Sequence, residues 1–146
     1  MKQVMCSIAT TEKQISACYP LMYQLRPNLA HSEFIARVLH QQKYGYQLLQ
    51  AVCGKTISGV AGFSIGHKLA WGKHMYVDDL ITDTEQRSMG IGAVMLKWLE
   101  ENALQQGCGQ LHLDSGVQRF AAHKFYLREG FAISSHHFAK SLRSIK

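Results

Sequence analysis

Two glycines at the start of an expected helix form the part of this sequence best suited to binding a ligand. The segment consists of Arg87, Ser88, Met89, Gly90, Ile91 and Gly92. Glycine lets the backbone approach a ligand closely, and the first N–H groups of a helix have no partner within it. These donors and the helix dipole favour an anion, and Arg87 adds a full positive charge. The segment therefore predicts an anion site, although a flexible turn between strand and helix would show the same glycines.

Two familiar phosphate-binding motifs do not fit this sequence. The third glycine of the dinucleotide fingerprint G-x-G-x-x-G would fall at Met95. Residues 54–56 look like the end of a P-loop, but the first glycine of that loop would be Leu49, and the triplet lies between two expected strands. The anion site at the helix start is therefore of another kind.

Two motifs at the expected distance resemble those of the GNAT N-acetyltransferases. The first contains Leu80, Ile81, Thr82 and Asp83 followed by the glycine segment, and is similar to motif A, an arginine or glutamine, two residues, then Gly-x-Gly or Gly-x-Ala. The second, residues 122–131, resembles motif B, in which Phe-Tyr is followed a few residues later by Gly-Phe. The resemblance covers residues 75–138, and motif B is most similar to a branch that includes aminoalkylphosphonate N-acetyltransferases.

This resemblance implies that the chain binds acetyl-CoA as a cosubstrate. In such enzymes the strand before motif A separates from the next strand, and the pantetheine arm lies in the gap. By resemblance, the arm is lined by Leu80, Ile81 and Thr82. The pyrophosphate is expected on the amides of the segment that runs from Arg87 through Gly92 to Ala93. Arg119 stands where the family often has asparagine, and we count it among the cofactor-binding residues.

Acetyl transfer to an amine requires a general base and a general acid. By resemblance, Tyr126 is the acid that protonates the leaving thiolate. Asp79 is the first candidate for the base and Asp78 the second, because a β-bulge would change which of the two faces the cleft. Alternatively, one of these acids is solvated and the other caps a turn. His112 and His123 are further candidate bases because imidazole titrates near neutral pH.

The acceptor is expected to be the primary amine of a small molecule. A phosphonate-bearing amine would bring Arg26, Arg37 or Lys68 to the cleft, whereas a polyamine would bring an acid such as Glu33. Three alternatives stay open: a protein or peptide N-acetyltransferase, an acetyl-CoA sensor without turnover, and a non-catalytic basic module that binds nucleic acid. No helix-turn-helix, zinc-finger or RRM signature favours the last.

The hydrophobic pattern predicts the elements that must position these residues. Strands are expected over residues 5–9, 46–53, 56–66, 73–82, 111–114 and 131–138. Helices are expected from Thr10 or Thr11 to Pro27, from His31 to about Tyr44, from Gly90 to a C-cap at Gly107, and over residues 119–128. Gly54 and Lys55 are typical of a two-residue hairpin turn.

Size and composition favour one domain over residues 1–146. We expect the α/β GNAT fold, a mixed, mostly antiparallel sheet of six or seven strands with about four helices. The resemblance also implies a homodimer to which the last strand contributes. The apolar runs are too short for a membrane helix, and the four cysteines form no C-x-x-C pair, so we expect a cytoplasmic protein with free thiols. The adjacent His136 and His137 point to opposite faces of a strand, so no metal site is predicted.

Overall fold

A five-stranded sheet in the order β1-β2-β3-β4-β5 forms the centre of the unit Met1–Leu113. The computed structural model describes residues 3–143, and of residues 87–89 it describes the backbone alone. The strands are β1 (Val4–Ile8), β2 (Gln47–Cys53), β3 (Thr56–Lys68), β4 (Gly72–Thr82) and β5 (Gln110–Leu113). Neighbours are antiparallel except β4 and β5, which run parallel. The mixed, mostly antiparallel sheet is confirmed, with five strands among the described residues instead of six or seven.

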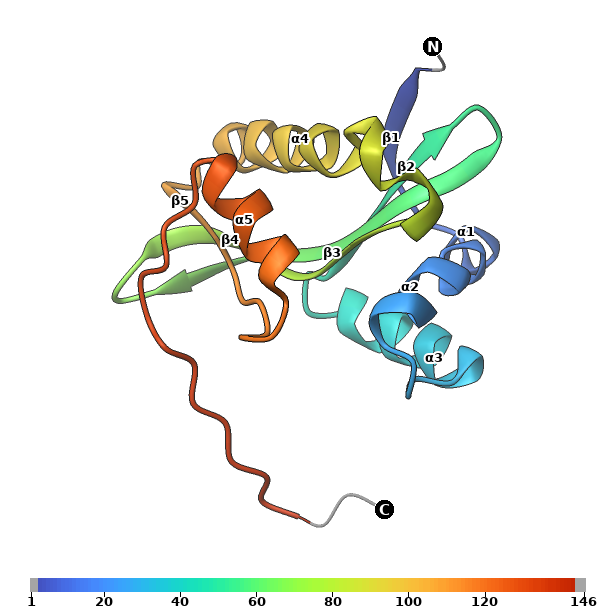
Figure 1. The fold of residues 1–146 in the computed structure, drawn as a ribbon. Coiled ribbons are helices and arrows are strands. Elements are labelled where there is room, and N and C mark those ends of the chain that lie inside the picture. The colour runs from blue at the N-terminus through green and yellow to red at the C-terminus, as the bar shows by residue number, and fades with distance from the viewer. Residues whose placement is uncertain (1–2, 144–146) are drawn as a thin grey trace. The chain divides into compact units, whose positions relative to one another are not determined.

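Helices cover both faces of this sheet (Figure 1). They are α1 (Glu12–Ala17), α2 (Tyr19–Leu25), α3 (His31–Gln42) and α4 (Ile91–Gln105), with a 3-10 helix, η1 (Thr84–Met89), before α4. α4 packs on β3 and β4 from one face, and α2 contacts the same two strands from the other (Figure 1). Phe34 and Val38 of α3 are buried in one cluster with Ile81 of β4. α2 and α3 therefore share a core with β4, the strand that carries Asp78 and Asp79.

The first expected helix is divided in two at Cys18, which ends α1 and begins α2. Thr11 caps α1 through a capping box with Gln14, which confirms one of the two threonines predicted as the cap. Pro20 lies in the first turn of α2, where its missing N–H removes no helical hydrogen bond. Arg26 ends α2 at φ −124° and ψ 71°, because a residue that precedes proline is disfavoured in the helical region.

The other predicted elements of this unit are found within one or two residues of their expected bounds. Cys53 pairs with Thr56, so that Gly54 and Lys55 form the predicted hairpin turn. Gly107 follows the C-cap of α4 at φ 82°, and its N–H donates to the carbonyl of Leu104. Glycine is needed there because other residues are strained at positive φ. The 3-10 helix η1 was not predicted.

The second unit, Asp114–Lys146, contains α5 (Phe120–Arg128) followed by extended chain. The predicted strand over residues 131–138 is wrong, because these residues have no partner strand among the described residues. The side chains of Ile133 and Phe138 are 75% and 92% exposed, so neither of these residues packs in a core. The described part of the chain has five α-helices, one more than expected.

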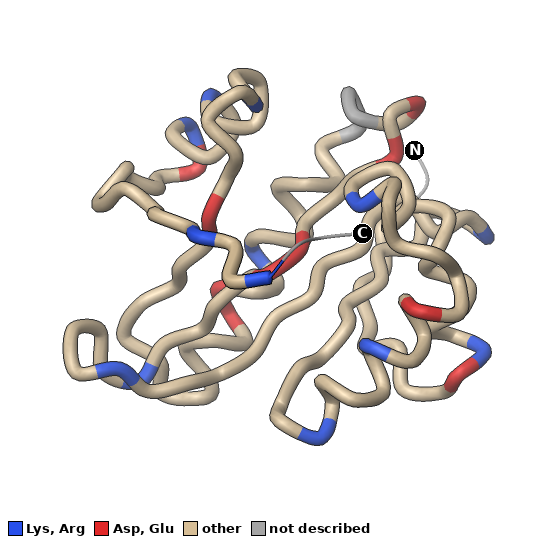
Figure 2. Tube along the Cα trace, turned by 90° about the horizontal axis from the view of Figure 1, so that it is seen from below, with Lys and Arg blue, Asp and Glu red and all other residues tan. Residues whose placement is uncertain are grey.

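Charged residues come from many elements rather than from one. Figure 2 shows Lys and Arg positions along helices, strands and turns, with Asp and Glu positions between them. The net charge of +6 is therefore not concentrated in a single basic helix. Within residues 3–143, no helix combines the length and the apolar character needed to cross a bilayer.

Candidate functional site

A cavity of about 610 Å³ lies in the first unit between α2, α3 and β4. Its apolar wall is formed by Met22, Leu25, Pro27, Leu29, Phe34 and Val38. Its charged side chains are Arg26, Glu33, Arg37, Asp78 and Asp79. Asn28, Gln41 and Tyr46 add uncharged polar groups, so that the lining is about as polar as it is apolar. A cavity of this size that combines apolar side chains with convergent polar groups is suited to a small molecule.

A β-bulge in β4 separates the two aspartates of the cavity. Gly62 of β3 pairs with Asp79 and Phe63 pairs with Val77, so Asp78 has no partner on β3. The bulge interrupts the strict alternation of side chains at the point where the sequence left the choice between the two acids open. Gly62 is also required for packing, because a Cβ atom at this position would overlap with the phenol oxygen of Tyr46.

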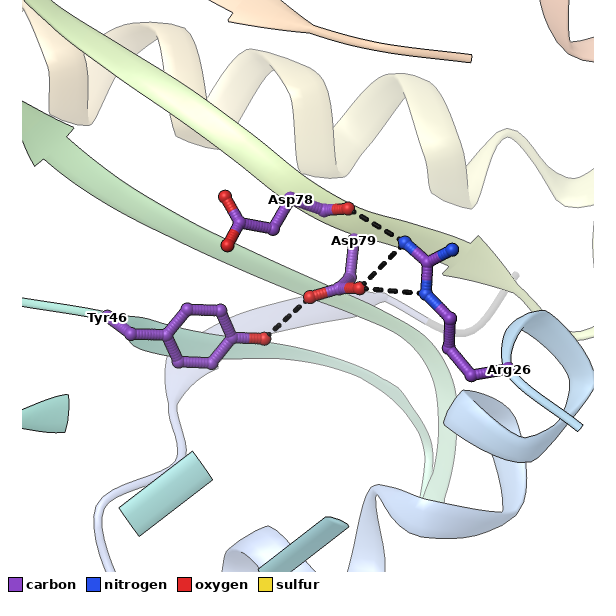
Figure 3. Close-up of polar contacts among 4 residues, drawn as sticks. All are labelled: Arg26, Tyr46, Asp78 and Asp79. Atoms are coloured by element: carbon purple, nitrogen blue, oxygen red, sulfur yellow. Dashed lines mark hydrogen bonds and ion pairs between the residues drawn. The ribbon is translucent and has the colours of Figure 1, made fainter. Parts of the chain in front are cut away.

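Asp79 is held by hydrogen bonds from two sides (Figure 3). One carboxylate oxygen accepts from Nε and Nη2 of Arg26 at 3.1 and 3.0 Å, and the other accepts from the hydroxyl of Tyr46 at 2.9 Å. The Asp79 side chain is only 17% exposed. Burial, followed by the charge of Asp79, raises the pKa of Tyr46, so this phenol stays protonated and remains a donor. Asp79 is therefore committed to structural contacts.

Asp78 differs from its neighbour because only its backbone is held. Its carbonyl accepts from Nη2 of Arg26 at 3.0 Å, while its carboxylate points away from Arg26 (Figure 3). Among the described side chains, which do not include those of residues 87–89, none bonds to or pairs with this carboxylate. Burial raises the pKa of Asp78 to about 6, the charge of Asp79 adds to the rise, and Arg26 opposes it. Asp78 therefore has a carboxylate without a partner among the described side chains, and this group can accept a proton close to neutral pH.

The residues expected along the pantetheine arm lie in the part of β4 that is no longer paired with β5. The ladder between β4 and β5 ends at the pair Val77 and Leu113. Leu80, Ile81 and Thr82 follow beyond that point and pair with β3 alone. The side chain of Ile81 is buried in the core, whereas Leu80 and Thr82 are partly exposed. Backbone groups on this edge thus have no strand partner among the described residues, in the part of the sheet where the resemblance expects the arm.

The N-terminus of α4 presents backbone donors that have no partner among the described groups. Gly90 caps the helix at φ 73° without a side-chain hydrogen bond, and the first turn contains no acid. Val94 donates to the carbonyl of Gly90, so the amides of Ile91, Gly92 and Ala93 precede the first helical hydrogen bond. The side chain of Ile91 is fully buried and anchors the turn. The side chains of Arg87, Ser88 and Met89 lie outside the described residues.

In the second unit, α5 carries Tyr126 and begins after Arg119. Tyr126 is buried at 8% exposure, and burial raises the pKa of its phenol, while the charge and a hydrogen bond of Arg119 lower it. This phenol remains protonated near neutral pH, as a general acid must. Nε2 of His123 lies 2.7 Å from the carbonyl of Gly116 and is engaged there.

The remaining predicted residues do not line the cavity. His112 stacks on Trp71 with ring centres 3.4 Å apart, and Lys68 lies over the same indole ring at 4.2 Å. His137 lies 3.7 Å from the carboxylate of Asp114. Within the part of the chain that the structure describes, no group of three His, Cys, Asp or Glu side chains could hold a metal ion.

Two contributions to the site were not foreseen from the sequence. Arg26 was considered only as a partner for a phosphonate, and Tyr46 was not considered at all. Each reaches Asp79 over a separation of 53 and 33 residues, respectively. Such long-range contacts leave no local pattern, although Pro27 does indicate that Arg26 leaves the helix.

Comparison with known proteins identifies the family. Residues 10–131 match the model of the acetyltransferase (GNAT) family. An uncharacterised N-acetyltransferase, YhdJ of Bacillus subtilis (strain 168), is 32% identical over 133 residues, 90% of this chain and 94% of that protein. An aminoalkylphosphonate N-acetyltransferase of Salmonella typhimurium (strain LT2) is 38% identical over 66 residues, 45% of this chain and 43% of that protein.

A solved structure supports the same fold. The aminoglycoside N-acetyltransferase AAC(6')-Iy in complex with CoA superposes with a TM-score of 0.85 at 14% identity, covering 99% of this chain and 97% of that one. The free amides at the start of α4 fit the phosphate-rich ligand of such proteins. The chain therefore belongs to the acetyltransferase (GNAT) family and is an N-acetyltransferase that uses acetyl-CoA.

Proposed function

We propose that this enzyme acetylates the primary amine of a small molecule bound in the cavity between α2, α3 and β4. The observation that carries the proposal is a site of about 610 Å³ in which one carboxylate, that of Asp78, has no partner among the described residues. An ammonium group would find its counter-charge there. The name of the Salmonella relative, an aminoalkylphosphonate N-acetyltransferase, also points to a small amine.

We propose Asp78 as the general base. Its carboxylate has no competing partner among the described side chains, and its raised pKa of about 6 brings it closer to that of an ammonium group. Arg26 and Tyr46 hold Asp79 in place, and Arg26 also holds the carbonyl of Asp78. This assignment reverses the order expected from the sequence, which placed Asp79 first.

We propose Tyr126 as the general acid and the edge of β4 with the start of α4 as the acetyl-CoA site. When bound, acetyl-CoA supplies the acetyl group as a thioester. The backbone groups proposed to hold it are those of Leu80, Ile81, Thr82, Gly90, Ile91, Gly92 and Ala93. Arg119 supports Tyr126 by a hydrogen bond and retains the proposed role of contacting the cofactor.

The test is thiol release from acetyl-CoA in the presence of a panel of small amines and of short peptides. Small amines are expected to support turnover, and Asp78→Asn and Tyr126→Phe are each expected to lower kcat by about 10²–10⁴-fold. Glu100→Gln, which removes one charge from an exposed position of α4, controls for net charge. Peptides that react faster than every amine would favour the protein-directed alternative. Full activity of Tyr126→Phe would show that Tyr126 is not the general acid.

We further propose that the protein forms a homodimer through residues 131–138. The exposed Ile133 and Phe138 support this proposal, because apolar side chains of this size gain from being covered by a partner. Light scattering is expected to give twice the monomer mass of 16.4 kDa. The double variant Ile133→Asp and Phe138→Asp is expected to be a monomer, and a monomeric wild type would contradict the proposal.

A further inference from the structure

The charged side chains of the cavity are paired so that one charge is left over. Arg26 bonds to Asp79 at 3.0 Å, and Arg37 lies 3.4 Å from Glu33 on the next turn of α3. Two cations thus cancel two of the three acids that line the described cavity, and the remaining acid is Asp78. The described side chains of the wall therefore carry one net negative charge, located on β4.

From this arrangement we infer that the acceptor carries one positive charge, on the nitrogen that is acetylated, and that the rest of the molecule is uncharged. The inference rests on the proposed function and specifies its substrate class. It separates monoamines with an uncharged remainder from two other classes that the sequence allowed, polyamines and phosphonate-bearing amines.

A second ammonium group finds no free acid among the described residues of the cavity. Asp79 already accepts three hydrogen bonds, and withdrawing it would leave the guanidinium of Arg26 without its carboxylate. Glu33 is paired with Arg37, which would be left beside the incoming cation. In either case the new ion pair leaves an arginine without its acid, next to the bound ammonium group of the same charge. A polyamine therefore gains nothing from its additional charges.

An anionic end group meets the reverse problem. Arg26 is engaged with Asp79 and with the carbonyl of Asp78. Arg37 is more accessible, since its side chain is 66% exposed and its pair with Glu33 is a weak surface pair. An anion that took Arg37, however, would leave Glu33 unpaired one turn away on the same helix. The new attraction would then be offset by repulsion between two negative groups.

The apolar wall supplies the binding surface for the remainder of the acceptor. Leu25, Leu29 and Phe34 are contributed by α2, the following loop and α3. Burying one methylene group increases affinity by about fourfold. A monoamine with a stem of several carbons is therefore expected to bind better than a short one.

Amines with the same stem and different ends provide the test. Hexylamine and 6-aminohexylphosphonate each carry one amine on a six-carbon stem. 1,6-Diaminohexane carries two equivalent amines on the same stem, so its kcat/KM is halved before the comparison. Their kcat/KM values are measured by thiol release, and their affinities by calorimetry on the CoA-saturated protein. Hexylamine is expected to exceed both others by at least about tenfold, since a charge without a partner is costly to desolvate. A diamine or phosphonate that equals or exceeds hexylamine would overturn the inference.

Two reciprocal variants test the pairing on α3 directly. Arg37→Gln frees Glu33 and is expected to improve 1,6-diaminohexane relative to hexylamine by about two- to fivefold, the range of an exposed ion pair. Glu33→Gln frees Arg37 and is expected to improve 6-aminohexylphosphonate to a similar extent. If both variants fold and neither of them changes the selectivity, the pairing argument is refuted. If the amines bind in the expected order without thiol release, the proposed function fails while the inference on the ligand stands.

Discussion

Two adjacent aspartates of β4 illustrate how differently single residues of one type can behave. Asp79 is nearly buried and accepts three hydrogen bonds, whereas the Asp78 carboxylate has no described partner and a raised pKa of about 6. A carboxyl with a raised pKa in the folded state stabilises the fold below its unfolded pKa, and this stability is lost as the pH rises through 6. Ionised Asp78 is therefore expected to destabilise the fold at neutral pH.

Replacing Asp78 with asparagine is thus expected to stabilise the protein at pH 8. We expect a gain of about 1 kcal/mol, a modest value because solvent screens the half-buried group, and a rise in Tm of about 3 °C. At pH 4, where the wild-type carboxyl is protonated, the difference from wild type should nearly vanish. Thermal unfolding at both pH values measures the effect. A variant that is more stable than wild type at pH 4 but not at pH 8 would contradict the prediction.

The substitution Asp79→Asn is expected to act in the opposite direction. The new amide could still accept from Tyr46, but Arg26 would lose its charged partner. We expect a loss of about 2 kcal/mol in the free energy of unfolding, the cost of removing a charged acceptor. Denaturant unfolding of the two asparagine variants side by side makes the comparison, and equal effects would show that the two carboxylates are not distinguished by their partners.

Arg26 is expected to set the pH at which Asp78 becomes a base. Asp79 and Arg26 face Asp78 with opposite charges, while Tyr46 stays neutral and Glu33 and Arg37 cancel on α3. Since Arg26 lowers the pKa of Asp78, Arg26→Gln should move the acidic limb of the kcat/KM profile to higher pH. Adding Asp79→Asn should move the limb back, because this change removes a charge that raises the same pKa.

A matched control is available for this experiment. Arg37→Gln removes the same charge from the same cavity, but Arg37 pairs with Glu33 and touches neither aspartate. Its acidic limb should shift less than that of Arg26→Gln. Equal shifts in the two variants would mean that only the overall charge of the cavity matters and that the contact of Arg26 with β4 does not.

At the scale of elements, Tyr46 packs tightly against Gly62 of β3, beside the bulge. The phenol lies directly over Gly62, which pairs with Asp79 beside the bulge. Gly62→Ala would push the phenol away from Asp79 and is expected to cost about 1–3 kcal/mol, the usual range for overpacking. Chemical denaturation measures this cost. The double variant Gly62→Ala with Tyr46→Phe is the control. If Gly62→Ala acts mainly by breaking the hydrogen bond from Tyr46 to Asp79, the acidic limb of the kcat/KM profile should lie at the same pH in the double and the single variant.

The elements themselves were largely predictable, and the differences have local causes. The amphipathic pattern and the glycines predicted α4 and the β2–β3 hairpin, because both depend on residues close in sequence. Cys18 divides the first helix, which the apolar spacing alone did not reveal. Residues 131–138 alternate like a strand but find no partner strand within residues 3–143, since pairing depends on a distant edge.

The candidate site was predictable only where motifs carry it. The glycine turn was recognised from its place at an expected helix start, and the two aspartates from their place before Leu80 in the motif that resembles the family's. The bulge was considered as the feature that would decide between the acids. The decision itself depends on Arg26 and Tyr46, whose contacts with Asp79 span 53 and 33 residues. No periodic pattern records such contacts, so the structure was needed to show that Asp79 is engaged.

At the scale of the whole molecule, net charge and ligand binding are connected. The chain carries a formal net charge of +6, and acetyl-CoA is an anion, so their attraction should weaken as salt screens it. Because ligand binding stabilises only the folded state, the melting temperature reports this attraction without any need for an acceptor amine.

Acetyl-CoA at a hundred times its dissociation constant should add about 2.7 kcal/mol and raise Tm by about 5–10 °C. AMP, which lacks the pantetheine arm and the pyrophosphate, should raise it much less. At constant ligand concentration the shift should decrease as sodium chloride is raised. Gly90→Ala, compared with its own unliganded Tm, should lose most of the shift, because alanine is strained at φ 73° and would reorient the amides of α4. An unchanged shift in Gly90→Ala would place the anion elsewhere on the molecule, and the absence of any shift in folded wild type would contradict binding at this helix.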